Sequence, residues 1–123
     1  MSEPTDVTSG LERELRIVRE DRAGAVVLRI GGEVDAFTVP RLTNAVADVV
    51  AEQPRMLVLD LSAVGFLASA GLSALLTMHR DVGDKTVLRI VADGRATLRP
   101  IHLTGLDQSL PLYPTLEASL AGL

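Results

Sequence analysis

The sequence predicts a single α/β domain, with a mixed sheet of about five strands and about four helices. The length of 123 residues is that of one domain and leaves no room for two. Near the N-terminus, apolar and polar residues alternate with the period of a strand, which predicts a hairpin. Farther along, helical periods alternate with short apolar runs, a pattern typical of strand–helix–strand units with parallel pairing. We expect residues 1–12 to form a flexible lead and residues 13–123 to form the domain.

The first two strands are expected at residues 15–19 and 25–30. Leu15 and Ile17 fall on one face of the first segment, and Val26, Leu28 and Ile30 fall on one face of the second with Arg29 on the other. The turn-forming residues 21–24 (Asp-Arg-Ala-Gly) separate the two segments. Because the connection is so short, the two strands are expected to pair antiparallel. The pair Gly31-Gly32 is expected to end the second strand.

A first helix and a central strand follow. Pro40 stands near the helix start, where its missing N–H group costs nothing, and Pro54 ends the helix. Apolar residues recur at the spacing of one helix face, at Val39, Leu42, Val46, Val49 and Val50. Residues 56–59 form a continuous apolar run, which predicts a central strand covered on both faces.

The second half of the chain continues the alternation. A loop over residues 62–68 leads to a second helix, which carries Leu72, Leu75 and Leu76 and ends at Gly83. The remaining elements are a strand, a helix, a short strand and a last helix capped by Thr115, the first three at residues 86–91, 95–103 and 110–113. Pro100 is expected to kink or shorten the third helix, and Gly105 is expected to follow its end.

The composition excludes several classes of function. With no Cys the chain has no disulfide, no thiolate catalysis and no cysteine-based metal site, and two His are too few for a three-histidine zinc site. A net charge of −4 and only 2% aromatic residues argue against nucleic-acid binding. The N-terminus lacks the basic start and apolar run of a signal peptide, and no apolar stretch approaches the length of a membrane span. We expect a cytoplasmic protein without metal, cofactor, nucleic acid or membrane contact.

The loop after the central strand holds the main candidate, Ser69. Function in open α/β sheets gathers at the C-terminal ends of strands, and Ser69 falls there, where the second helix begins. Its neighbours Ala68 and Ala70 are small, which leaves the hydroxyl accessible to another protein. Ser69 is also a candidate N-cap, and the two roles can coexist. Phe66 is expected by default to plug the core beneath the loop.

Enzymatic interpretations of this region fail on the residues they require. A nucleophile elbow needs Gly-x-Ser-x-Gly, and Leu67 occupies the first glycine position. A phospho-aspartate receiver could use Asp60 but needs a Lys after the last strand, whereas the single lysine, Lys85, precedes the fourth strand. No glycine-rich phosphate-binding motif is present. The sequence therefore predicts that the protein is not an enzyme.

Four segments in order carry a resemblance to a known family. The segment DLSAVGFLASAGL at residues 60–72 resembles the signature of STAS domains, the anti-sigma factor antagonists of bacteria. GEVD at residues 32–35, followed by PRL at 40–42, is similar to the family's Gly-Glu-Leu-Asp segment and first helix. LTGLD at residues 103–107 and YPTLEA at 113–118 are also typical. The chain is thus identified as a member over about residues 15–120, with the family's mixed sheet and packed helices.

The resemblance implies a partner switch. In this family the antagonist binds an anti-sigma factor, usually a serine kinase of the histidine-kinase-like ATPase type, and so releases a sigma factor. The kinase phosphorylates a residue matching Ser69, the complex dissociates, and a metal-dependent serine phosphatase restores the binding form. The family usually has Asp where this chain has Ala68, and a second hydroxyl where it has Ala70.

The surface that would meet the partner surrounds Ser69. It is expected to comprise a first loop, the end of a second loop, and the start of the second helix: Asp35, Ala36, Phe37, Thr38, Phe66, Leu67, Ala68, Ala70, Gly71 and Ser73. A second hypothesis is a STAS scaffold or ligand-sensing module that is never phosphorylated. Ala68 in place of the usual carboxylate keeps this alternative open.

Overall fold

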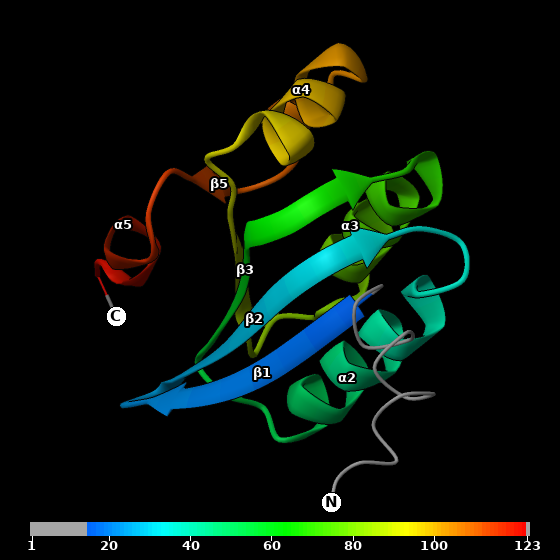
Figure 1. The fold of residues 1–123 in the computed structure, drawn as a ribbon. Coiled ribbons are helices and arrows are strands. Elements are labelled where there is room, and N and C mark those ends of the chain that lie inside the picture. Colours follow the sequence, from blue (N-terminus) through cyan, green and yellow to red (C-terminus); the bar gives the residue numbers. More distant parts are fainter. Residues whose placement is uncertain (1–14, 123) are drawn as a thin grey trace, which may run out of the picture.

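Five strands form one mixed sheet in the order β1-β2-β3-β4-β5 (Figure 1). The computed structural model describes residues 15–122, so the flexible lead predicted for residues 1–12 lies outside the described residues. β1 and β2 pair antiparallel, and every other pairing is parallel. The predicted hairpin, mixed sheet and element order are confirmed, with strands at Leu15–Arg22, Ala25–Val34, Met56–Leu67, Val87–Val91 and Leu112–Tyr113.

Within residues 15–122, four α-helices and one 3-10 helix cover the sheet unequally. They are α2 (Val39–Ala51), α3 (Ser69–Asp81), α4 (Arg95–Leu103), η1 (Leu106–Gln108) and α5 (Leu116–Leu120). The main core lies between one sheet face and the helices α2, α3 and α4, and Figure 1 shows α2 and α3 together behind the strands. The short helix α5 packs on the opposite face over a small cluster that includes Val27 and Val58.

The two central strands are longer than expected. Gly31-Gly32 does not end β2, which runs to Val34, and the loop predicted for residues 62–68 is strand up to Leu67. The extensions pair with each other in parallel, with register shifts on either side of the glycine pair. Gly32 adopts a positive φ of 90°, as a residue at a bulge often does. The sequence prediction was wrong here because a glycine that breaks a strand locally is held in it by the partner strand.

β3 extends beyond β4, and α4 takes the place of the missing neighbour. β4 pairs only with the first part of β3, over Met56–Asp60. α4 packs against β3 and buries Ile101 in the main core. Pro100 does not shorten this helix, which spans the predicted residues, and Gly105 follows its end with a φ of 75°. The end of β3 is therefore held on one side by β2 and supported by α4.

The last helix and its cap are those predicted from the sequence. Thr115 caps α5, since its Oγ1 accepts a hydrogen bond of 3.0 Å from the N–H of Ala118. Leu116 and Leu120 pack toward the sheet as expected. Within residues 15–122, no helix combines the length and apolar character that crossing a bilayer requires.

Candidate functional site

The C-terminal ends of β2 and β3 lie side by side and feed α2 and α3. Val34 pairs with Leu67 in the sheet, and the N–H of Ala68 donates a 2.9 Å hydrogen bond to the Val34 carbonyl. The turn after Val34 and the start of α3 therefore lie next to each other at one edge of the molecule, at the arrowheads of β2 and β3 in Figure 1. We call this the Ser69 edge; its side chains come from residues 33–38 and 66–73.

Ser69 is the first residue of α3, and its side chain is exposed. The N-cap is Ala68, in an extended conformation, so the interpretation of Ser69 as the cap is wrong by one residue. An alanine cannot accept a hydrogen bond through its side chain, and the first helical bond joins the Leu72 N–H to the Ala68 carbonyl at 3.0 Å. The Ser69 hydroxyl is thus available, and it stands beside first-turn N–H groups that no side chain caps within the described residues.

Gly71 explains how α3 comes so close to β2. A Cβ atom at Gly71 would lie 2.7 Å from both Leu67 Cδ1 and Val34 Cγ1, and 3.2 Å from the Val34 carbonyl oxygen. Since real side chains essentially never approach so closely, any larger residue would push the helix away from the strand. Gly71 therefore sets the position of Ser69 relative to the end of β2.

Two reciprocal hydrogen-bond pairs fix the turn after β2. Asp35 Oδ1 accepts from the N–H groups of Phe37 and Thr38 at 2.9 and 3.0 Å. Thr38 Oγ1 accepts from the Asp35 N–H and donates to the Glu33 carbonyl, both at 2.9 Å. Thr38 is only 4% exposed, so the bonds that it makes are shielded from water. These hydrogen bonds hold the backbone of the turn, residues 35–38, in one conformation.

Two phenylalanines project from this edge into solvent. Phe37, at the tip of the turn, is 89% exposed, and Phe66, near the end of β3, is 50% exposed. The expectation that Phe66 plugs the core is wrong. Leu67 does so instead at 5% exposure, because neighbouring residues of a strand point to opposite faces. Large exposed aromatic side chains of this kind are typical anchors of protein interfaces.

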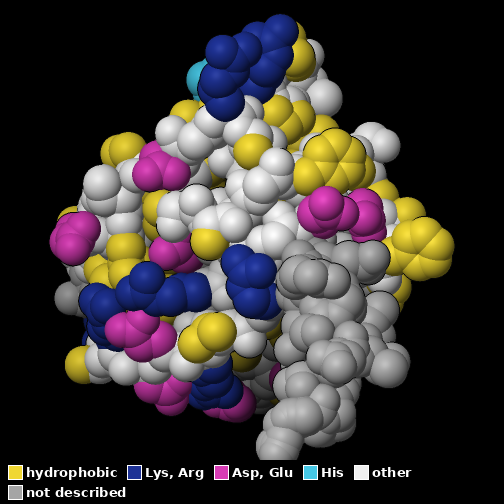
Figure 2. Space-filling model, in the orientation of Figure 1, with side chains coloured by type: hydrophobic (Ala, Val, Ile, Leu, Met, Phe, Trp, Pro, Cys, Tyr) yellow, Lys and Arg dark blue, Asp and Glu magenta, His cyan; other side chains and the backbone are white. Residues whose placement is uncertain are grey.

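Acidic side chains lie beside the phenylalanines. Glu33 is exposed and stands opposite Phe66 in the β2–β3 register, and Asp35 follows two residues later. On this side of the molecule, Figure 2 shows hydrophobic and acidic side chains gathered together. Glu33 was not among the expected surface residues. Its position follows from the extension of β2 through Gly32, which the glycine pair concealed in the sequence.

The structure brings all the expected surface residues to one edge but exposes only some of their side chains. The exposed members are Ala36, Phe37, Phe66, Ser69 and Ser73. The half-buried members are Asp35, Ala68 and Ala70. The buried members, which shape the edge from within, are Thr38, Leu67 and Gly71. Nowhere in residues 15–122 do three or more His, Asp or Glu side chains come together in a way that could hold a metal ion.

Comparisons with known proteins agree on one family and fold. The family model described as the STAS domain matches residues 16–119. The anti-sigma-F factor antagonist RsfB of Mycobacterium tuberculosis is 42% identical over 122 residues, which are 99% of this chain and 93% of RsfB. The crystal structure of an anti-sigma factor antagonist from Mycobacterium paratuberculosis has a TM-score of 0.81 at 44% identity, covering 98% of this chain and 96% of that one.

A more distant structure shares the fold alone. The anti-sigma factor antagonist SpoIIAA in its unphosphorylated form has a TM-score of 0.67 at 16% identity, covering 83% of this chain and 91% of its own. The phosphorylated form of SpoIIAA, described as a Bacillus cell fate determinant, has a TM-score of 0.60 at the same identity, covering 83% of this chain and 95% of its own.

Proposed function

The chain belongs to the STAS domain family, and on that premise we propose that it is an anti-sigma factor antagonist. Its partner is an anti-sigma factor of the serine-kinase type, a histidine-kinase-like ATPase, and complex formation releases a sigma factor. The observation that carries this proposal is the exposed Ser69 hydroxyl at the first position of α3, flanked by the solvent-exposed Phe37 and Phe66. The names of the mycobacterial relatives support the class of partner.

The Ser69 edge suits a docking surface. Phe37 and Phe66 present apolar area on a rigid support, so their ordering on binding costs little conformational entropy. Two ends of strands and two helix starts fix the backbone around them. A partner that packs on this surface covers the Ser69 hydroxyl and also brings a kinase site close to it.

Phosphorylation of Ser69 switches binding off in this proposal. A phosphate adds about −1.5 to −2 charges and three acceptor oxygens at pH 7. Within the domain this charge is favourable, because the start of α3 offers free N–H groups and the positive end of its dipole. Across the interface it is unfavourable, because a partner surface that packs on the exposed Phe37 and Phe66 is apolar and the new charge must be desolvated there. A loss of about 3 kcal/mol in binding is more than a hundredfold in affinity.

Dephosphorylation resets the switch, and we assign that step to a metal-dependent serine phosphatase that meets the protein transiently. The existence of SpoIIAA in both phosphorylated and unphosphorylated forms supports such a cycle in a protein of this fold. Ala68 favours a second candidate function, a scaffold or ligand-sensing module that is not phosphorylated, because the carboxylate usual in the family is absent beside Ser69.

The binding part of the proposal is tested with purified proteins. The chain is titrated with the serine-kinase anti-sigma factor of the same organism in the absence of ATP, and the Kd is measured by calorimetry. Phe37→Ala and Phe66→Ala are each expected to weaken binding by about 1–3 kcal/mol. Val87→Ala is the matched control, because Val87 is as exposed as Phe66 but begins β4 at the opposite end of the sheet. Tight binding that neither phenylalanine affects would contradict the proposed surface.

A further inference from the structure

A basic surface on α4 stands apart from the acidic character of the chain. α4 carries Arg95, Arg99 and His102 and no acidic residue, whereas the whole protein has a net charge of −4. Figure 2 shows Lys and Arg side chains grouped, with a His beside them, at the end of the molecule where Figure 1 places α4. The helix therefore presents a local positive charge on a negative protein.

The two arginines have no partner within residues 15–122. Neither the Arg95 nor the Arg99 side chain makes an ion pair or hydrogen bond with the described residues. Five other arginines are engaged with carboxylates or with backbone carbonyls, namely Arg19, Arg22, Arg29, Arg41 and Arg89. Arg55 and Arg80 share with Arg95 and Arg99 the lack of such a partner within the described residues, but they do not lie next to a second arginine on one helix face. Residues four apart on a helix have Cβ atoms about 5–6 Å apart. Arg95 and Arg99 therefore start from neighbouring positions on one helix face, so both side chains can reach one anionic segment.

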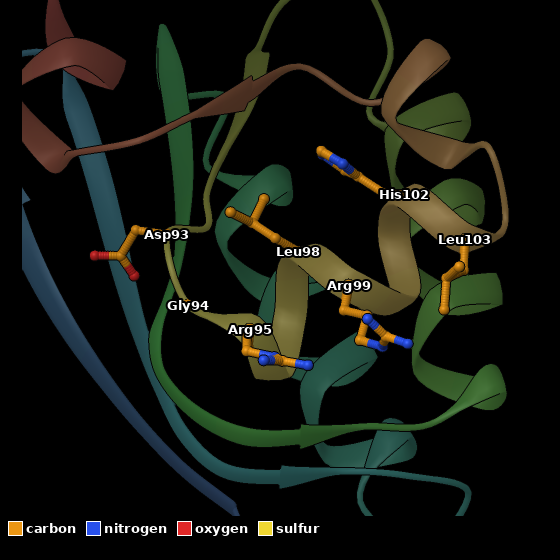
Figure 3. Close-up of a pocket in the computed structure, with 7 residues that line it drawn as sticks. All are labelled: Asp93, Gly94, Arg95, Leu98, Arg99, His102 and Leu103. Carbon is orange, nitrogen blue, oxygen red and sulfur yellow. The ribbon is translucent and has the colours of Figure 1, made fainter.

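The same surface has an apolar component. The successive i, i+4 positions Arg95, Arg99 and Leu103 form one exposed stripe, and Leu103 is 73% exposed. Leu98 and His102 form the adjacent stripe, and in Figure 3 they point to the other side of the helix from Arg95 and Arg99. The residues labelled in Figure 3 line an open pocket of about 360 Å³, and the one acidic residue among them, Asp93, precedes the helix. Arg95 and Arg99 beside the exposed Leu103 match a segment that carries both carboxylates and apolar side chains.

The location of α4 connects this surface to the Ser69 edge. α4 packs against β3, and Phe66 lies near the end of that strand. A protein docked on Phe66 is therefore within reach of α4 as well. A nucleic acid fits the surface poorly, because two fixed cations on a chain of net charge −4 offer few phosphate contacts.

We propose that the basic surface of α4 is a second docking site, which receives an acidic, leucine-bearing segment of the anti-sigma factor. This inference rests on the proposed function, since it takes the same partner. The Ser69 edge supplies the contact that phosphorylation controls, and α4 supplies an electrostatic contact that speeds association and fixes orientation.

The test compares charge variants in the titration with the anti-sigma factor at low and high salt. Arg95→Glu/Arg99→Glu is expected to weaken binding about tenfold or more and to flatten the salt dependence of Kd. Arg95→Gln/Arg99→Gln, which only removes the charges, is expected to weaken it about threefold. Leu103→Ala is expected to weaken it about threefold without changing the salt dependence.

The matched control is Arg55→Glu/Lys85→Glu, which makes the same change in net charge at exposed positions beside the start of β4, at the other end of the sheet. It is expected to change Kd less than about twofold, and melting curves verify that all variants are folded. An unchanged Kd and salt dependence in both α4 double variants would overturn the inference while leaving the proposed function intact. The inference would also be overturned if the α4 double variants lost binding to a short DNA duplex but kept the wild-type Kd for the anti-sigma factor. If the wild-type chain bound no anti-sigma factor at all, the proposed function itself would fail.

Discussion

At the scale of single residues, Ser69 is placed so that a negative charge is tolerated by the fold. It stands at the first position of α3, and its neighbour at the N-cap, Ala68, leaves the first-turn N–H groups without a side-chain acceptor. A carboxylate or phosphate at residue 69 can accept from these groups and interacts favourably with the helix dipole. A negative charge at residue 69 is therefore expected to reduce the free energy of binding to the partner but not the stability of the free protein.

Ser69→Asp is accordingly expected to keep or raise the stability of the domain, by about 0.3–1 kcal/mol. Thermal or urea unfolding measures this difference. Ser73→Asp is the matched control, because it places the same charge one turn further along α3, where the dipole effect has faded. A loss of more than about 1 kcal/mol in Ser69→Asp alone would show that the charge disrupts the fold, against an interface mechanism.

Gly71→Ala is expected to destabilise the domain by about 1–3 kcal/mol, because the added methyl group meets Leu67 and Val34 at impossible distances. Gly65→Ala is the control, since a Cβ there would come no closer than 4.0 Å to another group, the Gly32 carbonyl oxygen. Urea unfolding of both variants gives the comparison. Equal stability of the two would contradict the account of how α3 is seated on β2.

At the scale of elements, the turn between β2 and α2 holds the docking surface in shape. Its hydrogen bonds are internal and come from Asp35 and the buried Thr38, so Phe37 is carried on a fixed backbone. The turn illustrates a division of labour at this edge: some residues present area to a partner, while others only position the backbone.

Thr38→Val is expected to cost about 1–3 kcal/mol, because the Asp35 N–H and the Glu33 carbonyl lose a partner that water replaces poorly. Thr43→Val is the matched control. The Thr43 hydroxyl donates to the Pro40 carbonyl in an exposed part of α2, so its loss is expected to cost less than about 0.5 kcal/mol. Urea midpoints of the two variants decide between them, and a similar cost for both would refute the role given to Thr38.

Element order and type were predictable from the sequence because each element carries its own periodic signal. The apolar spacing in α2 and α3 and the run at 56–59 identified the core without tertiary information. The ends of β2 and β3 were not predictable in this way. Their extension depends on pairing with each other across register shifts, a long-range interaction that local signals at Gly31-Gly32 do not contain.

The position of the candidate site was predictable from the sequence, but the orientation of its side chains was not. Ser69 was located correctly as the residue at the helix start, but the helix begins one residue earlier than a serine cap implies, with Ala68 as the N-cap. Because β3 continues to Leu67, the side chains of Phe66 and Leu67 alternate, and the exposed and buried members of the pair follow from that strand. The role of Gly71 could not be predicted from the sequence, because the close approach involves Leu67 of β3 and Val34 of β2.

At the scale of the whole molecule, a charge network clamps β1 to the end of α2. Arg19 contacts Glu52 and Asp21 at 2.7 Å each. Hydrogen bonds from Arg19 hold the pKa of both carboxyl groups below their usual values. All three groups are exposed, so salt screens their interaction.

The lowered pKa values determine the sign of a pH effect. Near pH 4.5, the ordinary pKa of a Glu, the unfolded chain binds more protons than the folded one, so the contribution is present above that pH and is lost as pH falls. The Tm difference between the wild type and Arg19→Gln is expected to shrink between about pH 5 and pH 3. Melting curves across this range provide the test, and a Tm difference that stays constant with pH would contradict it.

The proposed partner switch depends on Ser69. The most direct measurement mixes the protein with the serine-kinase anti-sigma factor and ATP, locates phosphate by mass spectrometry, and follows the complex by size-exclusion chromatography. We expect one phosphate on Ser69 and loss of the complex, whereas Ser69→Ala stays unmodified and bound. A complex that persists with Ser69 phosphorylated, or that forms without any phosphorylation in the presence of ATP, would contradict the switch and favour the scaffold.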